Sequence, residues 1–209
     1  MPILRIARHG ETTWNAQGRY QGRLDVPLSP LGRAQARALA EALSDKDIGA
    51  IISSPLLRCV ETAMPLAELI GVTVQTDPLL TEIAHGTWQG RYRDEIARSE
   101  PELYRAWREH PETVRFEGGE SLRDVEVRWQ RFVTGFEPHS NTLIVTHDIV
   151  ARIALLERTG RSIQTLRDVR SLNGAYAEFA VERDRWRLLA ESVSSHLKDL
   201  EADHERQAL

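Results

Sequence analysis

The chain opens with ILRIARHGE at residues 3–11, a short apolar run that ends in charged and imidazole side chains. We interpret Ile3 to Ala7 as a buried β-strand, because short apolar runs bounded by polar residues are typical of strands in a covered sheet. Arg8 and His9 would then lie at the carboxyl end of that strand. Ligands bind at the carboxyl ends of the strands in open parallel sheets, so this segment predicts both a fold class and the place of a site.

Further apolar runs alternate with helical patterns along the rest of the chain. Helix starts are indicated by Ser29-Pro30, by Ser54-Pro55 and by a capping box of Ser121 with Asp124. This alternation favours an α/β three-layer sandwich, with a mostly parallel central sheet covered by helices on both faces. The later strands are predicted at Gly49–Ile52, Val72–Gln75, Thr142–Val145, Tyr176–Val181 and Trp186–Glu191, with a turn at 182–185. Helices are predicted to end near Ile70, Phe136 and Arg158.

The chain of 209 residues is interpreted as one domain, residues 1–209, with no internal repeat and no linker. A charged and aromatic stretch at 92–111 is predicted to form helices inserted outside the sheet. The polar segment 194–209 is predicted to be a helical tail.

Composition excludes several classes of protein. Hydrophobic residues make up 41% and charged residues 28%, which is ordinary for a globular protein. The net charge of -4 shows no basic excess, so we expect no nucleic-acid partner. No apolar run approaches the roughly 20 residues of a membrane span, and the start does not resemble a signal peptide. With Cys59 as the single cysteine, we expect a cytoplasmic protein without a disulfide.

Cationic side chains follow three of the predicted strands. Arg8 and His9 follow the first strand, Arg58 lies one turn into the helix after the second, and His147 follows the fourth. Such groups repel one another unless an anion lies between them, and arginine matches the geometry of phosphate. The sequence therefore predicts a phosphate site at this edge of the sheet.

Common phosphate-binding motifs are absent from the sequence. It contains neither a G-x-x-x-x-G-K-[ST] loop nor a G-x-G-x-x-G loop. Cys59 lacks the arginine that cysteine-based phosphatases carry six residues later. No dense cluster of His, Cys, Asp or Glu suggests a metal site, so neither a metal nor another cofactor is expected.

The order of these motifs resembles the histidine phosphatase superfamily, the phosphoglycerate-mutase-like fold, over nearly the whole chain. One departure is Asp148, where the family usually has glycine. The residues that carry the resemblance are Arg8-His9-Gly10-Glu11-Thr12, Trp14-Asn15, Gln21-Gly22, Asp25, Pro27-Leu28, Gly32, Ser53-Ser54-Pro55, Arg58, Thr62-Ala63, Glu82, Gly86, Trp88, Gly90, Gly118-Gly119-Glu120-Ser121 and Thr146-His147.

The resemblance implies a phosphoenzyme mechanism without a metal. His9 would attack phosphorus and become phosphohistidine, which water then hydrolyses. Glu82 would protonate the leaving alcohol and later accept a proton from water. The residues expected to hold the phosphoryl oxygens are Arg8, Arg58 and His147, with Asn15, Gln21 and Gly22 as further substrate-binding residues.

Within the family, the sequence favours a phosphatase over a mutase. Mutases carry Arg-His-Tyr-Gly directly after the acidic residue, whereas Glu82 is followed by Ile83-Ala84-His85-Gly86. This stretch and His196 are most similar to the metal-independent phosphoserine phosphatases. We therefore expect a homodimer that converts L-phosphoserine to serine and phosphate, with His85 and His196 as substrate-binding residues.

Other functions stay open at this point. One alternative is a phosphatase of broad specificity, or one that acts on a sugar phosphate or an alpha-ribazole phosphate. A cofactor-dependent phosphoglycerate mutase and a phosphate-binding module without activity are weaker alternatives. All of them act on or bind a small phosphorylated metabolite.

Overall fold

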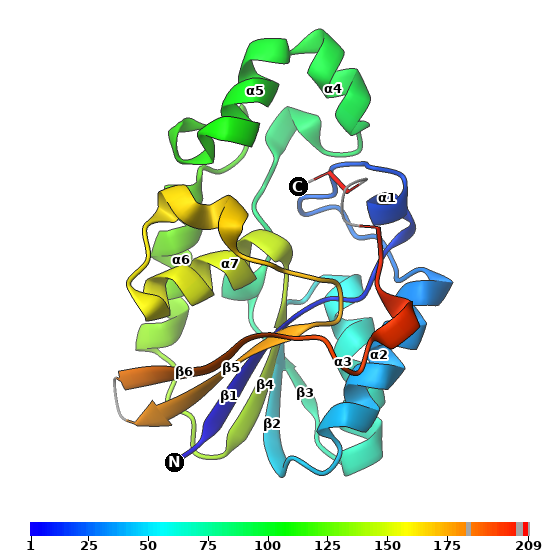
Figure 1. Ribbon diagram of the computed structural model, residues 1–209, viewed down its shortest axis with the longest axis vertical. Coiled ribbons are helices and arrows are strands. Elements are labelled where there is room, and N and C mark those ends of the chain that lie inside the picture. The colour runs from blue at the N-terminus through cyan, green and yellow to red at the C-terminus, as the bar shows by residue number, and fades with distance from the viewer. Residues whose placement is uncertain (183–184, 204–206, 209) are drawn as a thin grey trace.

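A six-stranded sheet forms the centre of the computed structural model, which describes residues 1–182, 185–203 and 207–208 (Figure 1). The strands are adjacent in the order β3-β2-β4-β1-β5-β6. Their bounds are β1 (Ile3–Arg8), β2 (Ile48–Ser53), β3 (Val74–Thr76), β4 (Asn141–Thr146), β5 (Tyr176–Glu182) and β6 (Arg185–Val193).

The first four strands are parallel to one another, and β5 is antiparallel to both of its neighbours. β1 pairs with β4, and β2 pairs with both β4 and β3, all in parallel. β5 runs antiparallel to β1 and to β6. The parallel strands have their carboxyl ends at one edge, which confirms the predicted arrangement. The predicted turn at 182–185 includes positions 183 and 184, which lie outside the described residues.

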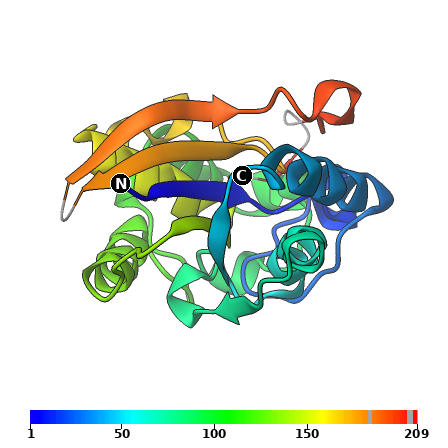
Figure 2. The same ribbon diagram turned by 90° about the horizontal axis from the view of Figure 1, so that it is seen from below.

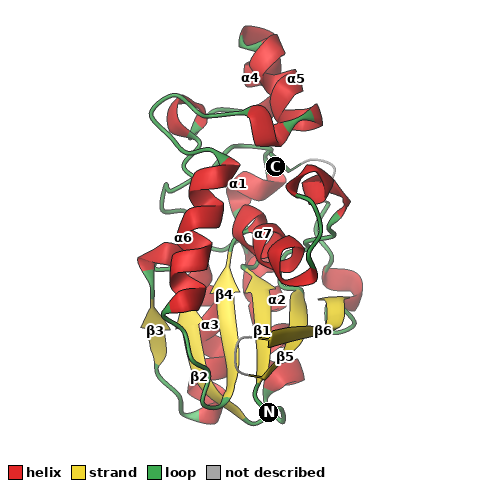
Figure 3. Cartoon of the chain, turned by 90° about the vertical axis from the view of Figure 1, so that its left-hand side faces the viewer, coloured by secondary structure: helices red, strands yellow, loops and turns green. Residues whose placement is uncertain are grey.

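Helices cover both faces of the sheet. Seen from below, α2 and α3 lie on one side of the sheet while α6 and α7 lie on the other (Figure 2). Figure 3 shows α6 and α7 in front of the strands. This arrangement confirms the three-layer sandwich. The helices are α1 (Thr13–Ala16), α2 (Pro30–Leu43), α3 (Leu57–Ile70), α4 (Arg93–Ser99), α5 (Pro101–Glu109), α6 (Leu122–Thr134) and α7 (Asp148–Thr159).

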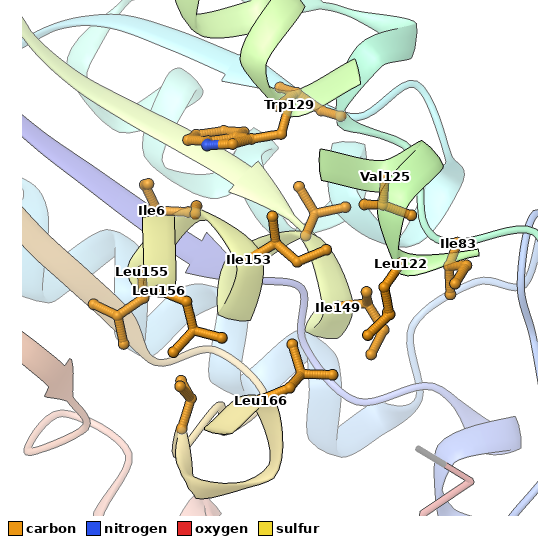
Figure 4. Close-up of a cluster of buried hydrophobic side chains, with 14 of the residues drawn as sticks. Ile6, Ile83, Leu122, Val125, Trp129, Ile149, Ile153, Leu155, Leu156 and Leu166 are labelled. Carbon is orange, nitrogen blue, oxygen red and sulfur yellow. The ribbon is translucent and has the colours of Figure 1, made fainter. Parts of the chain in front are cut away.

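Alternation along the strands divides the buried side chains between two cores. Ile6 and Ile144 point toward α6 and α7, whereas Ala7 and Leu143 join the cluster beneath α2 and α3. In the larger core, Ile153 of α7 packs near other aliphatic side chains and the indole of α6 (Figure 4). Because both faces of the sheet are buried, the sequences of the central strands are nearly continuous apolar runs.

Most strand bounds differ from the prediction by one or two residues, and for β3 the helix before it gives the reason. We predicted a strand over Val72–Gln75, but β3 begins at Val74. Gly71 ends α3 in the left-handed conformation, and the N–H of Val72 donates to the carbonyl of Ala67. These two residues therefore complete the helix end and are not available for the sheet.

The segment 92–111 contains α4 and α5, which stand above the carboxyl ends of the strands (Figure 1). Trp107 of α5 is completely buried, so the segment is anchored to the rest of the chain by its aromatic side chains. None of the described helices is long and apolar enough to span a bilayer.

The predicted helical tail at 194–209 is not helical in its described part. This part contains a single 3₁₀ turn, η5 (Lys198–Leu200), and positions 204–206 and 209 lie outside the described residues. Leu197 is completely buried and Gln207 bonds to Arg8, so tertiary contacts hold the segment. A helix is stabilised mainly by packing of an apolar face, and this polar segment has no such face. Its tertiary contacts therefore decide its conformation.

Candidate active site

The carboxyl ends of β1 and β4 bring two histidines together. The N–H of His9 donates to the carbonyl of Thr146 at 2.9 Å, which continues the ladder between the two strands past their ends. The rings of His9 and His147 meet edge to face, with their centroids 5.2 Å apart. Two residues that are 138 positions apart in sequence therefore form the centre of the site.

The local contacts of His9 fix which ring nitrogen is free to react. Nδ1 lies 2.7 Å from the carbonyl oxygen of Gly10. A carbonyl oxygen only accepts, so Nδ1 carries the hydrogen and Nε2 keeps its lone pair. Burial, followed by the charges of Arg58 and Arg8, holds the pKa of His9 well below its ordinary value. His9 is therefore neutral, with a nucleophilic Nε2.

Arg58 is held by the loop that contains Gly22. Its Nη1 donates to the carbonyl of Leu24 at 2.9 Å and its Nη2 to the carbonyl of Gly22 at 2.7 Å. Nε is buried and has no partner among the described residues. Burial lowers the pKa of Arg58 from its ordinary value. The sequence predicted Gly22 as a substrate-binding residue, and the structure shows that its carbonyl orients Arg58.

Arg8 is buried beneath the C-terminal segment. Nη1 donates to the carbonyl of Ser171 at 2.7 Å, and Nη2 donates to Oε1 of Gln207 at 2.6 Å. Nη1 also lies 3.3 Å from Oδ1 of Asp148, which is an ion pair between two almost completely buried side chains. The residue that departs from the family pattern is thus a direct neighbour of Arg8.

His147 precedes the first turn of α7 and has polar contacts with two side chains. Its Nε2 lies 2.8 Å from the hydroxyl of Ser54 and 3.4 Å from Sγ of Cys59. Burial and the charge of Arg58 hold the pKa of His147 well below its ordinary value. In this environment His147 is a neutral hydrogen-bonding group rather than a cation.

Glu82 provides a carboxyl group that is a weaker acid than usual. Its side chain is buried, and Oε1 accepts a hydrogen bond from the N–H of Ile83 at 2.9 Å. Burial, together with the negative charge of Asp148, raises the pKa of Glu82 to about 7. A carboxyl group with this pKa can both donate and accept a proton near neutral pH.

Thr12 organises two of the predicted substrate-binding residues. Its hydroxyl lies 3.0 Å from Oδ1 of Asn15 and 2.9 Å from Oε1 of Gln21, and its single hydrogen is donated to one of these oxygens at a time. Oδ1 of Asn15 also accepts from the N–H of Thr12 in the capping box of α1. Since the amide oxygens are engaged in this way, the amino groups of Asn15 and Gln21 remain to donate to a ligand.

His85 lies in an aromatic cluster behind the site. Its ring packs against Tyr20, Trp107 and Phe116, with centroids 4.9 to 5.8 Å apart. Both ring nitrogens are buried without a partner among the described residues, and burial lowers the pKa of His85 to about 3. His85 follows Glu82 closely in sequence, but the structure buries its neutral ring among aromatic side chains.

His196 lies on the C-terminal segment, next to the start of β5. Its Nε2 bonds to the carbonyl of Gly174 at 2.9 Å, and its ring stacks on Tyr176. No contact of the described structure joins it to His9 or Glu82. Its contacts anchor the C-terminal segment to β5, and they give no support to a role in substrate binding.

Several residues at the site were not assigned a role from the sequence. Thr62 accepts the N–H of Gly10, which follows the nucleophile, and Asn173 donates to the carbonyl of His9. Gln207 bonds to both Arg8 and Asn173. Thr62 lies in the motif that follows Arg58, but a lone glutamine near the end of the chain has no signal in the sequence.

Together these side chains can transfer a phosphoryl group. A neutral Nε2 of His9, two guanidinium groups and a carboxyl of raised pKa lie at one edge of the sheet and are almost completely buried. Within the described residues, no group of three metal-binding side chains is placed to hold a metal ion. The chemistry that this set suits is attack on a phosphate monoester, with proton transfer to the leaving oxygen.

Comparison with known proteins agrees with this chemistry. The family model described as Histidine phosphatase superfamily (branch 1) matches residues 4–193. "Phosphoserine phosphatase 1" of Hydrogenobacter thermophilus is 34% identical over 94% of this chain and 95% of its own. "Glucosyl-3-phosphoglycerate phosphatase" of Mycobacterium tuberculosis is 43% identical over 59% of this chain and 55% of its own. The solved structure of Bacillus stearothermophilus YhfR has a TM-score of 0.89 at 27% identity, covering 94% of this chain and all of that one.

Proposed function

The chain belongs to the histidine phosphatase superfamily, and we propose that it hydrolyses L-phosphoserine through a phosphohistidine at His9, without a metal ion. The observation that carries the proposed mechanism is the hydrogen bond between Nδ1 of His9 and the carbonyl of Gly10. This bond leaves Nε2 unprotonated and aims it away from the backbone, as an attacking nitrogen requires.

In the first step, Nε2 of His9 forms a bond to phosphorus while the bond from phosphorus to the alcohol oxygen breaks. Charge on the three equatorial oxygens is stabilised by donors already in place, chiefly Arg8 and Arg58. Each of these arginines keeps a buried Nε without a described partner, which leaves a donor available for a phosphoryl oxygen. The neutral His147 and the amino group of Asn15 can add uncharged donors.

Glu82 supplies and recovers the proton. In the first step the carboxyl protonates the leaving alkoxide, which becomes serine when the substrate is phosphoserine. In the second step the carboxylate accepts a proton from the water that attacks phosphohistidine, so that His9 and phosphate are released. The pKa of about 7 that burial and Asp148 give Glu82 suits both steps near neutral pH.

Phosphoserine is favoured by the donors around His85, which follows Glu82 by three residues. Four buried polar groups around His85 have no partner among the described residues. Donors left unpaired in a buried cluster call for an acceptor, and a carboxylate on the leaving alcohol is one. Relatives named for phosphoserine and for glucosyl-3-phosphoglycerate act on esters that carry a carboxylate. The four groups are the hydroxyl of Tyr20, the ring of His85, Nε1 of Trp107 and Nε of Arg167.

The test is hydrolysis of a panel of phosphate monoesters by the wild type and by His9→Ala. L-phosphoserine is expected to be the best substrate, and 3-phosphoglycerate, a sugar phosphate and an aryl phosphate serve as comparisons. His9→Ala is expected to lose activity by about 10⁴-fold or more, as other covalent catalysts do when the nucleophile is removed. Acid-labile phosphate is expected on the quenched wild type and not on His9→Ala. Ordinary turnover by His9→Ala would refute the mechanism, whereas a different best substrate would refute only the specificity.

A further inference from the structure

We propose that Asp148 is a positioning residue, which holds Arg8 in the orientation in which it receives the phosphoryl group. The inference rests on the proposed function, because it takes Arg8 to bind that group. Asp148 is the first residue of α7 and is 2% exposed, next to His147 at the end of β4.

The carboxylate of Asp148 joins two guanidinium groups. Oδ1 lies 3.3 Å from Nη1 of Arg8, and Oδ2 accepts a hydrogen bond of 2.8 Å from Nε of Arg152. Arg152 follows one turn later on the same helix, so the backbone of α7 sets the spacing of this pair. The carboxylate is therefore fixed on one side by its own helix and directed at Arg8 on the other.

Arg152 is itself anchored to the main chain. Its Nη1 donates to the carbonyl of Leu166 at 3.0 Å and also to the carbonyl of Val169, at the end of the 3₁₀ segment η4 (Ile163–Asp168). Backbone carbonyls inside a packed core have little freedom to move. The contacts from η4 through Arg152 and Asp148 to Arg8 thus form a continuous support for the phosphate-binding arginine.

Asp148 contacts Nη1 of Arg8, and the phosphoryl group can be bound by the other guanidinium nitrogens. Nη1 is occupied by the carbonyl of Ser171 and by Asp148, whereas Nε is buried without a described partner. Nε and Nη2 lie on one edge of the guanidinium group. Nη2 gives one hydrogen to Oε1 of Gln207, which leaves its second hydrogen and Nε as the donors that can meet phosphoryl oxygens along that edge. Holding Nη1 therefore fixes the direction in which the binding edge points.

Asp148 acts as a fixed counter-ion rather than as a proton carrier. Burial by itself would raise the pKa of Asp148, but the charges of Arg152 and Arg8 outweigh it and lower the pKa to about 2. The carboxylate is thus ionised over the whole range in which the enzyme is expected to work. A buried arginine without such a partner is unfavourable and would turn toward other acceptors.

A purely electrostatic role and a positioning role predict opposite effects of Asp148→Asn. The asparagine keeps the size of the side chain and removes one negative charge near the phosphate site. By charge alone, inorganic phosphate would then bind more tightly, and turnover of an aryl phosphate, which depends least on the proton from Glu82, would not fall. If Asp148 positions Arg8, turnover falls although the repulsive charge has gone, because a misdirected donor no longer meets the transition state.

The experiment measures kcat and KM for an aryl phosphate, together with inhibition by inorganic phosphate, on the full chain. We expect Asp148→Asn to lower kcat by about 10- to 100-fold, the range typical of a misplaced catalytic group. Inhibition by phosphate should not become stronger. The inference is wrong if kcat stays within twofold of the wild type or if phosphate binds more tightly at unchanged kcat. An inactive wild type would instead refute the proposed function.

A double-mutant cycle tests whether the effect passes through Arg8. In the Arg8→Met background, adding Asp148→Asn is expected to change the residual activity by less than about twofold. An equal fall in both backgrounds would show that Asp148 acts elsewhere, for instance through Glu82, and would overturn the proposal.

Two further variants separate positioning from folding. Glu178→Gln removes the carboxylate partner of Arg5, which is 2.9 Å away and lies on the same strand as Arg8; its kcat is expected to equal that of the wild type. If Asp148→Asn does not fold, Arg152→Lys serves instead, because it keeps the charge but loses the fork that grips Asp148 and the two carbonyls. Arg152→Lys is expected to lower kcat in the same direction, and an unchanged kcat would count against the inference.

Discussion

At the scale of single residues, burial decides the protonation state of each reacting group. His9 and His147 are neutral because the low-dielectric interior and the nearby arginines disfavour imidazolium. The pKa of Glu82 shifts in the opposite direction, because burial disfavours the charged carboxylate. The same physical cause thus produces a base that can attack and an acid that can donate.

The pKa of about 7 at Glu82 predicts the pH dependence of the first step. Glu82 must be protonated to donate to the leaving alcohol, so kcat/KM for an alkyl phosphate is expected to fall as the pH rises above about 7. An aryl phosphate with a good leaving group needs this proton less, and its kcat/KM should fall less over the same range. Pre-steady-state and steady-state rates between pH 5 and 9 check this. Identical profiles for the two esters would contradict the role of Glu82.

His85→Ala is expected to lower kcat/KM for L-phosphoserine more than for an aryl phosphate. L-phosphoserine carries a carboxylate that the buried donors around His85 would bind, and an aryl phosphate does not. Trp107→Phe is the matched variant, because it keeps a large ring and removes only the Nε1 donor. It should also lower kcat/KM for L-phosphoserine more than for an aryl phosphate. Both substrates are assayed on one preparation. An equal fall on both would assign His85 to the packing of the aromatic cluster.

At the scale of elements, helix α7 combines packing with chemistry. Its amino-terminal end carries His147 and Asp148, and its buried face continues through Arg152 into the apolar core. Ile153 and Leu156 of that face are almost completely buried. The packing of α7 on the sheet is therefore what holds its first turn at the active site.

Ile153→Ala is expected to lower the free energy of unfolding by about 2–5 kcal/mol, because it removes buried methyl groups and leaves a cavity. Ile153 is 1% exposed within the cluster of Figure 4. Val127→Ala is the control, since Val127 is 52% exposed on α6 and its truncation should cost no more than about 0.5 kcal/mol. Urea denaturation of the three proteins measures the difference. Similar losses for both variants would contradict this account of the core.

At the scale of the whole molecule, the phosphate site is assembled from distant segments. Arg8 comes from β1, Arg58 from α3, Glu82 from the loop after η1 (Pro78–Leu80) and His147 from the end of β4. Gln207, near the end of the chain, contributes a hydrogen bond to Arg8. The charge that phosphoryl transfer needs is thus supplied by the chain itself in the mechanism proposed here.

Arg58→Ala is expected to cost about 2.7–4 kcal/mol of transition-state stabilisation, comparable to removal of one donor from an oxyanion hole. Since the proposed mechanism draws its positive charge from arginines, EDTA is expected to leave wild-type turnover unchanged. Steady-state assays with and without the chelator measure both effects. Activity that is lost with EDTA and restored by Mg²⁺ would contradict the metal-free mechanism.

Local patterns in the sequence determined the elements and the strand-end residues. Alternating apolar runs predicted the strands, and Ser29-Pro30 and the Ser121–Asp124 capping box predicted helix starts that the structure confirms. The start predicted at Ser54-Pro55 was wrong, because α3 begins at Leu57 and has no side-chain cap. These features depend on neighbours within a few residues, so the sequence displays them directly. For the same reason, Arg8, His9, Arg58 and His147 could be assigned to one edge of the sheet.

Only the tertiary structure decided the contacts between segments far apart in the chain. Arg8 and Gln207 are separated by 199 positions, and nothing local in either segment predicts their hydrogen bond. The ion pair of Asp148 with Arg8 and the burial of His85 arose in the same way, from packing. A side chain's partners and its dielectric surroundings depend on what the whole chain places around it, and these determine how acidic, how mobile and how available it is.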